Sequence, residues 1–141
     1  MVEKNCNNRL ITPEIKEALS KYPLYSQDGK KKDAMCVVKF CVDNIRWYIL
    51  EGQQEGDDYT LFGIVVGLQE TEYGYMSANE MADITKKVLI PSINSYVTLR
   101  ITKDLDFKPC KLGDIEDDEL QEFLSWFYDK EEDNDTNNIN Q

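Results

Sequence analysis

The side chains best suited to chemistry in this chain are aromatic and polar residues from three separate stretches. They are Tyr25, Ser26 and Gln27, then Trp47 and Tyr48, then Glu70, Glu72, Tyr73 and Tyr75. Tyrosine and tryptophan combine apolar area with a polar tip, which suits a ligand pocket or an interface. If the stretch at Tyr25 folds over the stretch at Glu72, hydroxyl, amide and carboxylate groups converge in one cleft. In the alternative interpretation, the tyrosines pack the loops and the glutamates are solvated.

Several common chemistries are excluded by residues that the chain lacks. It contains no histidine, so Ser-His-Asp and Cys-His activation and the usual zinc ligand sets are excluded. Four cysteines show no C-x-x-C spacing, and we interpret them as small hydrophobic residues. The pairs Asp57-Asp58 and Asp104-x-Asp106 lack the spacing of an EF-hand. We therefore expect no metal ion and no cofactor, and the sequence argues against an enzyme without excluding one.

The acidity of the chain is confined to its last part. The net charge is −11, of which residues 114–141 carry −10 and residues 1–113 only −1. Candidate partner-binding residues are Asp117, Asp118, Glu119 and Glu122, which suit a basic protein surface. The alternative is that this region only keeps the protein soluble. Lys30, Lys31 and Lys32 form the one short basic cluster, so we expect no direct binding of nucleic acid.

The elements that must position these side chains follow from local patterns. Thr12 and Pro13 predict a helix that ends near Tyr22, and Ser77-x-x-Glu80 predicts the start of another. Strands are predicted over Ala34–Val42, Ile45–Glu51, Tyr59–Leu68 and Tyr96–Thr102, with a short edge piece over Leu105–Pro109. A last helix begins at Asp114 or Ile115. The prediction is an α+β fold, with an antiparallel meander sheet of four to five strands and two or three packed helices.

The chain is predicted to form one domain with two less ordered ends. We expect a flexible segment over residues 1–9, a single domain over residues 10–129 that includes the acidic helix, and a disordered tail over residues 130–141. The N-terminus lacks the apolar run of a signal peptide, and the longest apolar stretch, Leu61–Leu68, is too short to span a membrane. We expect a cytoplasmic protein, and the oligomeric state is not predicted.

Six short motifs follow one another along the chain. They are Tyr22-Pro23-Leu24-Tyr25-Ser26-Gln27, Val38-Lys39-Phe40, Trp47-Tyr48, Leu61-Phe62-Gly63, Glu72-Tyr73-Gly74-Tyr75 and Asp104-Leu105-Asp106-Phe107-Lys108-Pro109. From Leu10 to Leu112, the chain resembles the uncharacterised bacterial family catalogued as domain of unknown function 2958. The resemblance implies a setting in plasmids, conjugative elements and phages, and it transfers no catalytic residue. The acidic region after Asp114 lies outside it.

Two hypotheses of function follow. The first is a non-catalytic interaction or regulatory protein of a mobile genetic element that binds a basic protein surface through its acidic region. The second is a small enzyme or ligand-binding domain that uses a cleft lined by Tyr25, Trp47 and Glu72.

Overall fold

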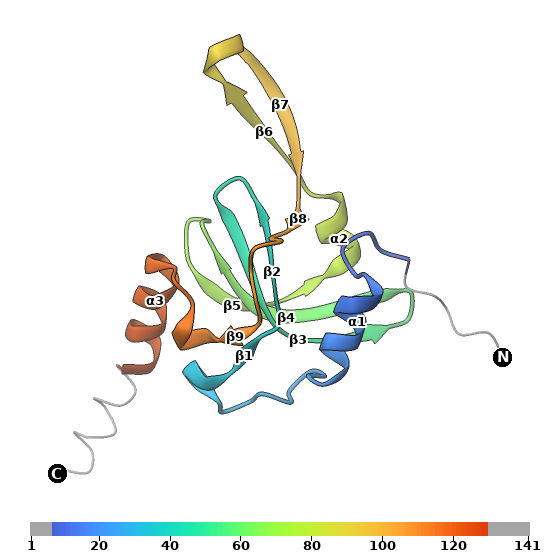
Figure 1. Cartoon of the computed structure of the whole chain (residues 1–141), viewed down its shortest axis with the longest axis vertical. Helices are drawn as coiled ribbons and strands as arrows, with labels where there is room; N and C mark the ends of the chain where they lie inside the picture. The colour runs from blue at the N-terminus through green and yellow to red at the C-terminus, as the bar shows by residue number, and fades with distance from the viewer. Residues whose placement is uncertain (1–6, 130–141) are drawn as a thin grey trace.

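The computed structural model describes residues 7–129, and its centre is a five-stranded antiparallel sheet (Figure 1). Residues 1–6 of the predicted flexible segment 1–9, and the whole predicted tail over residues 130–141, lie outside the described residues. The strand order is β5-β4-β3-β2-β8, with β2 over Val38–Val42, β3 over Ile45–Glu55, β4 over Asp58–Val66, β5 over Glu72–Ser77 and β8 over Thr102–Lys103. The predicted α+β fold with an antiparallel meander is confirmed.

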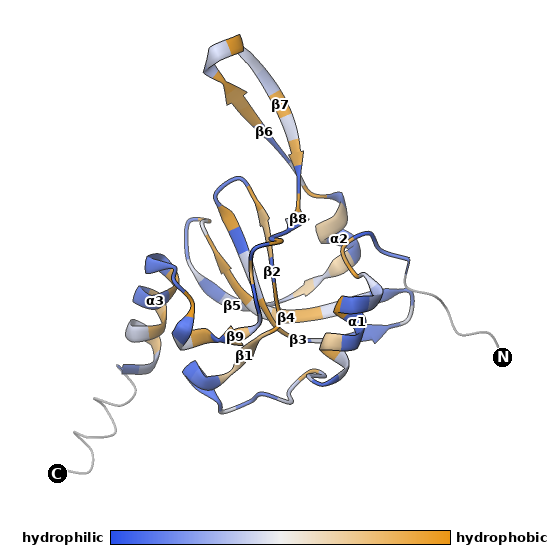
Figure 2. Ribbon diagram, in the orientation of Figure 1, coloured by the Kyte–Doolittle hydropathy of each residue, from blue (hydrophilic) through white to orange (hydrophobic). Residues whose placement is uncertain are grey.

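Helices cover both faces of this sheet. Helices α1 (Pro13–Ser20) and α2 (Ala78–Asp83) pack on one face, and α3 (Asp118–Leu124) packs on the other (Figure 1). Because side chains alternate along a strand, Trp47 of β3 joins the core beneath α1 while its neighbour Tyr48 joins the core beneath α3. Figure 2 shows the apolar residues gathered along the central strands, with hydrophilic turns at the sheet ends.

The helix starts show which local signals determine the structure. Thr12 caps α1 and Ser77 caps α2, each by accepting a hydrogen bond from the amide of the residue three positions later, as predicted. The prediction that the last helix begins at Asp114 or Ile115 is wrong. A 3₁₀ turn occupies Leu112–Asp114 instead, and α3 begins at Asp118, because the side chain of Asp117 caps it by accepting from the Leu120 amide.

Two of the longer strands were not predicted. One is β5, and the other is β6 (Thr85–Ile90), which pairs with β7 (Ser95–Arg100) in a hairpin that projects from the body (Figure 1). The predicted edge piece over Leu105–Pro109 is wrong, because a turn begins there and the short strand forms one residue later. The predicted strand Ala34–Val42 is interrupted at Val37. Its first part, β1 (Met35–Cys36), pairs with β9 (Cys110–Lys111), a partner distant in sequence.

The described part of the N-terminal segment is tied to the body. The Asn8 side chain donates to Asn79 at 3.0 Å, and the Arg9 guanidinium donates to the carbonyl oxygens of Ile101 and Ala82. Within residues 7–129, no helix has the length and apolar character needed to cross a membrane.

Candidate functional site

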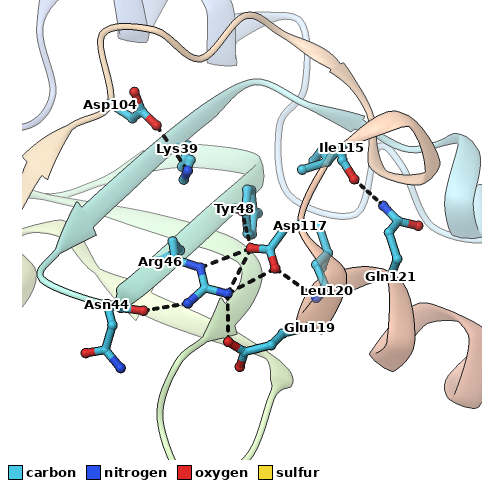
Figure 3. A network of polar contacts seen from close by, with 10 residues as sticks. All are labelled: Lys39, Asn44, Arg46, Tyr48, Asp104, Ile115, Asp117, Glu119, Leu120 and Gln121. Carbon is cyan, nitrogen blue, oxygen red and sulfur yellow. Dashed lines mark hydrogen bonds and ion pairs between the residues drawn. The ribbon is translucent and has the colours of Figure 1, made fainter.

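A polar network joins α3 to the sheet (Figure 3). The guanidinium of Arg46 on β3 donates through Nε and Nη2 to the two carboxylate oxygens of Asp117, both at 3.0 Å. The Tyr48 hydroxyl donates to the same carboxylate at 2.5 Å, and the Leu120 amide donates at 3.2 Å. All three donors thus converge on one acid at the start of α3.

The network shifts the titration of its members in opposite directions. Burial raises the pKa of Tyr48, and the hydrogen bond to Asp117 raises it further. Burial opposes ionisation of Asp117, but the bonds from Tyr48, the Leu120 amide and Arg46 outweigh it and lower the pKa of this carboxyl. Asp117, proposed from the sequence as a partner-binding residue, therefore has its carboxylate engaged inside the protein.

A β-bulge in β3 places a second acid on the same side of the sheet. The register to β4 shifts between Ile49 and Glu51, so Leu50 is the extra residue. Regular alternation would place Glu51 opposite to Leu50, yet both line the same hollow. The bulge thus aims the buried Glu51 at the loop that follows α1.

Glu51 and Gln27 hold that loop in place. The carboxylate oxygens of Glu51 accept from the backbone amides of Tyr25 at 2.7 Å and Gln27 at 2.8 Å. The side chain of the buried Gln27 exchanges hydrogen bonds with the backbone of Met35 and donates to the Leu50 carbonyl at 2.8 Å. These polar groups are satisfied within the protein, so their role is to shape the site.

An aromatic hollow of about 310 Å³ opens beside Glu51, between the loop after α1, the sheet and the end of α3. The Tyr73 ring lies nearly parallel to Phe62 at a centroid distance of 5.7 Å and meets Phe127 at 5.4 Å. The hydroxyls of Tyr73 and Tyr128 are hydrogen-bonded to each other. The residues that line the hollow are Gln27, Asp28, Gly29, Lys31, Ala34, Leu50, Glu51, Phe62, Tyr73, Phe127 and Tyr128.

The ligand-binding residues predicted from the sequence do not gather in one cleft. Trp47 is buried beneath α1, on the face of the sheet opposite to Tyr48. The rings of Tyr25 and Tyr75 are exposed and lie 6.3 Å apart. Ser26, Glu70 and Glu72 are exposed as well. Of the nine residues selected from the sequence, Gln27 and Tyr73 line the aromatic hollow.

The aromatic walls of this hollow include residues that the sequence analysis did not select. Phe62 was named only as part of a motif, and Phe127 was not named. A π-helical turn over Ser125–Asp129 continues α3 and brings Phe127 and Tyr128 to the hollow. The signal available was the run of aromatic residues over positions 126–128.

A second, wider hollow of about 640 Å³ has Tyr48 in its wall. Much of its wall comes from the stretch 104–110, and Lys39 contributes from β2. The Lys39 ammonium lies 3.0 Å from the Asp104 carboxylate, so an ion pair occupies its polar edge. The sequence motif from Asp104 to Pro109 therefore packs around Tyr48.

The outward face of α3 carries the remaining acidic candidates. Asp118, Glu119 and Glu122 are exposed. A shallow hollow of about 340 Å³ is formed there by Thr71, Glu119, Glu122, Phe123 and Trp126. The Trp126 side chain is 60% exposed, and its ring lies 6.3 Å from that of Phe123. Carboxylates and aromatic rings thus share one patch, which we call the acidic-aromatic face.

Comparison with protein families assigns the chain to one of them. Residues 10–114 match the family model described as protein of unknown function (DUF2958). The chain belongs to this family. Comparison with curated proteins and with solved structures gives no match. In this DUF2958 protein, the matched region ends before α3 begins, so Asp117 and the acidic-aromatic face lie outside it.

Proposed function

We propose that this protein is a non-catalytic interaction or regulatory protein of a mobile genetic element, active in the cytoplasm, that binds a Lys- and Arg-rich segment of a partner protein. The observation that carries the proposal is the acidic-aromatic face, where Glu119 and Glu122 lie in one hollow with Phe123 and Trp126. Glu119, Glu122 and Phe123 lie on α3 at spacings that bring them to neighbouring positions, and the π-helical turn that follows brings Trp126 to the same hollow.

The chemistry of this face suits a cationic side chain. A carboxylate attracts an ammonium or guanidinium group, and the ring face of tryptophan adds a cation–π interaction. Exposed tryptophan is also among the residues that contribute most to the affinity of protein interfaces. Glu119 is 3.4 Å from the Arg46 guanidinium, which leaves Glu122 as the acid free of a cationic neighbour within the described residues. Glu122 and Trp126 are therefore the central pair of the proposed face.

The test measures binding of a short Lys- and Arg-rich peptide by fluorescence. The chain has two tryptophans, and Trp47 is buried, so a Trp47→Phe background isolates the emission of Trp126. We expect a saturable change in that emission. Either Glu122→Gln in this background, or Trp126→Ala followed with a labelled peptide, should weaken binding about tenfold.

The control separates this face from the overall charge. Glu80→Gln removes one exposed acid on α2, which packs on the face of the sheet opposite to α3. This change should leave binding of the peptide within about twofold at fixed salt. A chain ending at Asp129 should bind equally well, because it keeps α3 and loses only the tail acids. If Glu80→Gln or this truncation weakens binding as much as Glu122→Gln, attraction is diffuse and the proposed face is wrong. Deletion of the whole region 114–141 is unsuitable because Leu120 and Leu124 are fully buried.

A further inference from the structure

We infer that the aromatic hollow beside Glu51 is a binding site for a small zwitterionic aromatic compound, of the class of the free aromatic amino acids. The ring enters between Phe62, Tyr73 and Phe127, the ammonium group meets Asp28, and the carboxylate meets Lys31. This site uses residues other than those of the acidic-aromatic face, so either proposal can fail alone.

The size and lining of the hollow determine the kind of compound. Its volume of about 310 Å³ is near the lower end of the range of roughly 300–1,000 Å³ typical of ligand pockets, so it suits a small ligand. Stacked and edge-on rings make its wall, and such walls favour another aromatic ring over an aliphatic chain. The interior therefore selects a ring.

The interior supplies no charge for recognition. Both oxygens of Glu51 accept backbone hydrogen bonds, and the Gln27 amide is engaged with the backbone of Met35 and Leu50. The hydroxyls of Tyr73 and Tyr128 bond to each other. Charged groups of a ligand must therefore be recognised at the rim.

The rim carries one acid and one base that are not paired with each other. Asp28 and Lys31 both line the hollow and are exposed, and neither takes part in an ion pair within residues 7–129. The neighbouring charges are already engaged, since Lys32 lies 3.1 Å from Asp129 and Asp33 lies 3.8 Å from Lys111. Lys30 is the other nearby base, and it does not line this hollow. Opposite charges on one rim match a ligand that carries both.

The backbone around the hollow is held in uncommon conformations. Lys31 and Tyr25 have φ values of 54° and 73°, in the left-handed region that residues other than glycine seldom occupy. The opposite wall comes from the π-helical turn over Ser125–Asp129, a type of turn that is often found at functional sites. Such strain persists only where surrounding contacts hold it, here the bonds from Glu51 to the loop.

The experiment compares four probes on the full chain by calorimetry and thermal shift: L-phenylalanine, phenethylamine, 3-phenylpropionate and L-leucine. Phenethylamine lacks the carboxylate, 3-phenylpropionate lacks the ammonium group, and leucine lacks the ring. We expect L-phenylalanine to bind most tightly, with each of the other three weaker by about tenfold.

Variants at the rim should act on one charge each. Asp28→Asn should weaken L-phenylalanine and phenethylamine about tenfold and leave 3-phenylpropionate unchanged. Lys31→Asn should weaken L-phenylalanine and 3-phenylpropionate about tenfold and leave phenethylamine unchanged. Asparagine tolerates the left-handed backbone at this position. Lys30→Asn removes the adjacent charge and is the matched control that should bind all probes as the original chain does.

Two results would overturn the inference. The first is the absence of a saturable signal with L-phenylalanine from a chain that unfolds cooperatively. The second is binding that Asp28→Asn and Lys31→Asn do not alter in the probe-specific pattern above, because the rim charges would then have no part in recognition.

Discussion

The two faces of the sheet are built in different ways. Beneath α1 and α2, the core consists of apolar side chains such as Leu19, Phe40 and Ile101. Beneath α3, apolar packing is combined with the Arg46–Asp117–Tyr48 network and the buried Glu51. The aromatic hollow and the hollow of the acidic-aromatic face also lie on this second side. The comparison indicates that the α1 face mainly stabilises the fold, while the α3 face combines an apolar core with oriented polar groups.

The largest expected effect is on the apolar face. Phe40 is fully buried among the residues beneath α1, so Phe40→Ala leaves a cavity in that core. We expect the free energy of unfolding to fall by about 4 kcal/mol. The matched change on the other face is Phe62→Ala, whose side chain is half-buried and borders the aromatic hollow, and it should cost about 2 kcal/mol. Urea unfolding measures both losses. Equal losses for the two variants would show that the two faces of the sheet do not differ in how much buried apolar side chains stabilise them.

The second effect tests the polar network that joins α3 to the sheet. Asp117→Asn keeps a capping side chain but removes the charge opposite Arg46, whose side chain is only 17% exposed. We expect a loss of about 3 kcal/mol at neutral pH, because the largely buried Arg46 then keeps only the exposed Glu119 as an acidic neighbour. Urea unfolding measures this loss, and Glu116→Gln, a change of a nearby exposed acid, is the control.

The same variant makes a prediction about pH. The folded protein lowers the pKa of Asp117, so its stabilising contribution is present above the unfolded pKa of about 3.9 and is lost as the pH falls through the folded value. The difference in stability between the original chain and Asp117→Asn should therefore shrink as the pH is lowered from about 5 to about 3. A difference that stays constant over this range would show that the charge of Asp117 is not the cause.

Local signals in the sequence predicted much of the apolar face. Thr12 and Ser77 cap their helices as expected, because each cap depends on residues a few positions apart. The strand β5 was missed because its residues, Glu72 to Ser77, were read as a polar-aromatic loop, and only pairing with β4 makes them a strand.

Contacts between distant residues determine the α3 face, and the sequence alone did not reveal them. Asp117 lies 71 residues from Arg46 in the chain, so its acidity suggested a surface role when it is in fact an internal partner. The bulge at Leu50 has no signal in the sequence, yet it moves Glu51 from one face to the other. The structure does not bring Tyr25, Trp47 and Glu72 together in one cleft, since alternation along β3 places Trp47 beneath α1 while Tyr25 and Glu72 are exposed.

The smallest expected effect concerns Glu51, which holds the loop of the aromatic hollow to β3. In Glu51→Gln, one of the two acceptors becomes an NH₂ group facing a backbone amide, so one buried bond is lost. We expect a loss of about 2 kcal/mol. Hydrogen exchange should be faster at the amides of Tyr25 and Gln27 than in the original chain. The amides of β2 should change only as much as the overall stability changes.

The control is Glu55→Gln at the exposed end of β3, which should alter neither measurement. If the two loop amides stay protected in Glu51→Gln, the loop is held by its other contacts, and the α3 face depends less on oriented polar groups than its structure indicates.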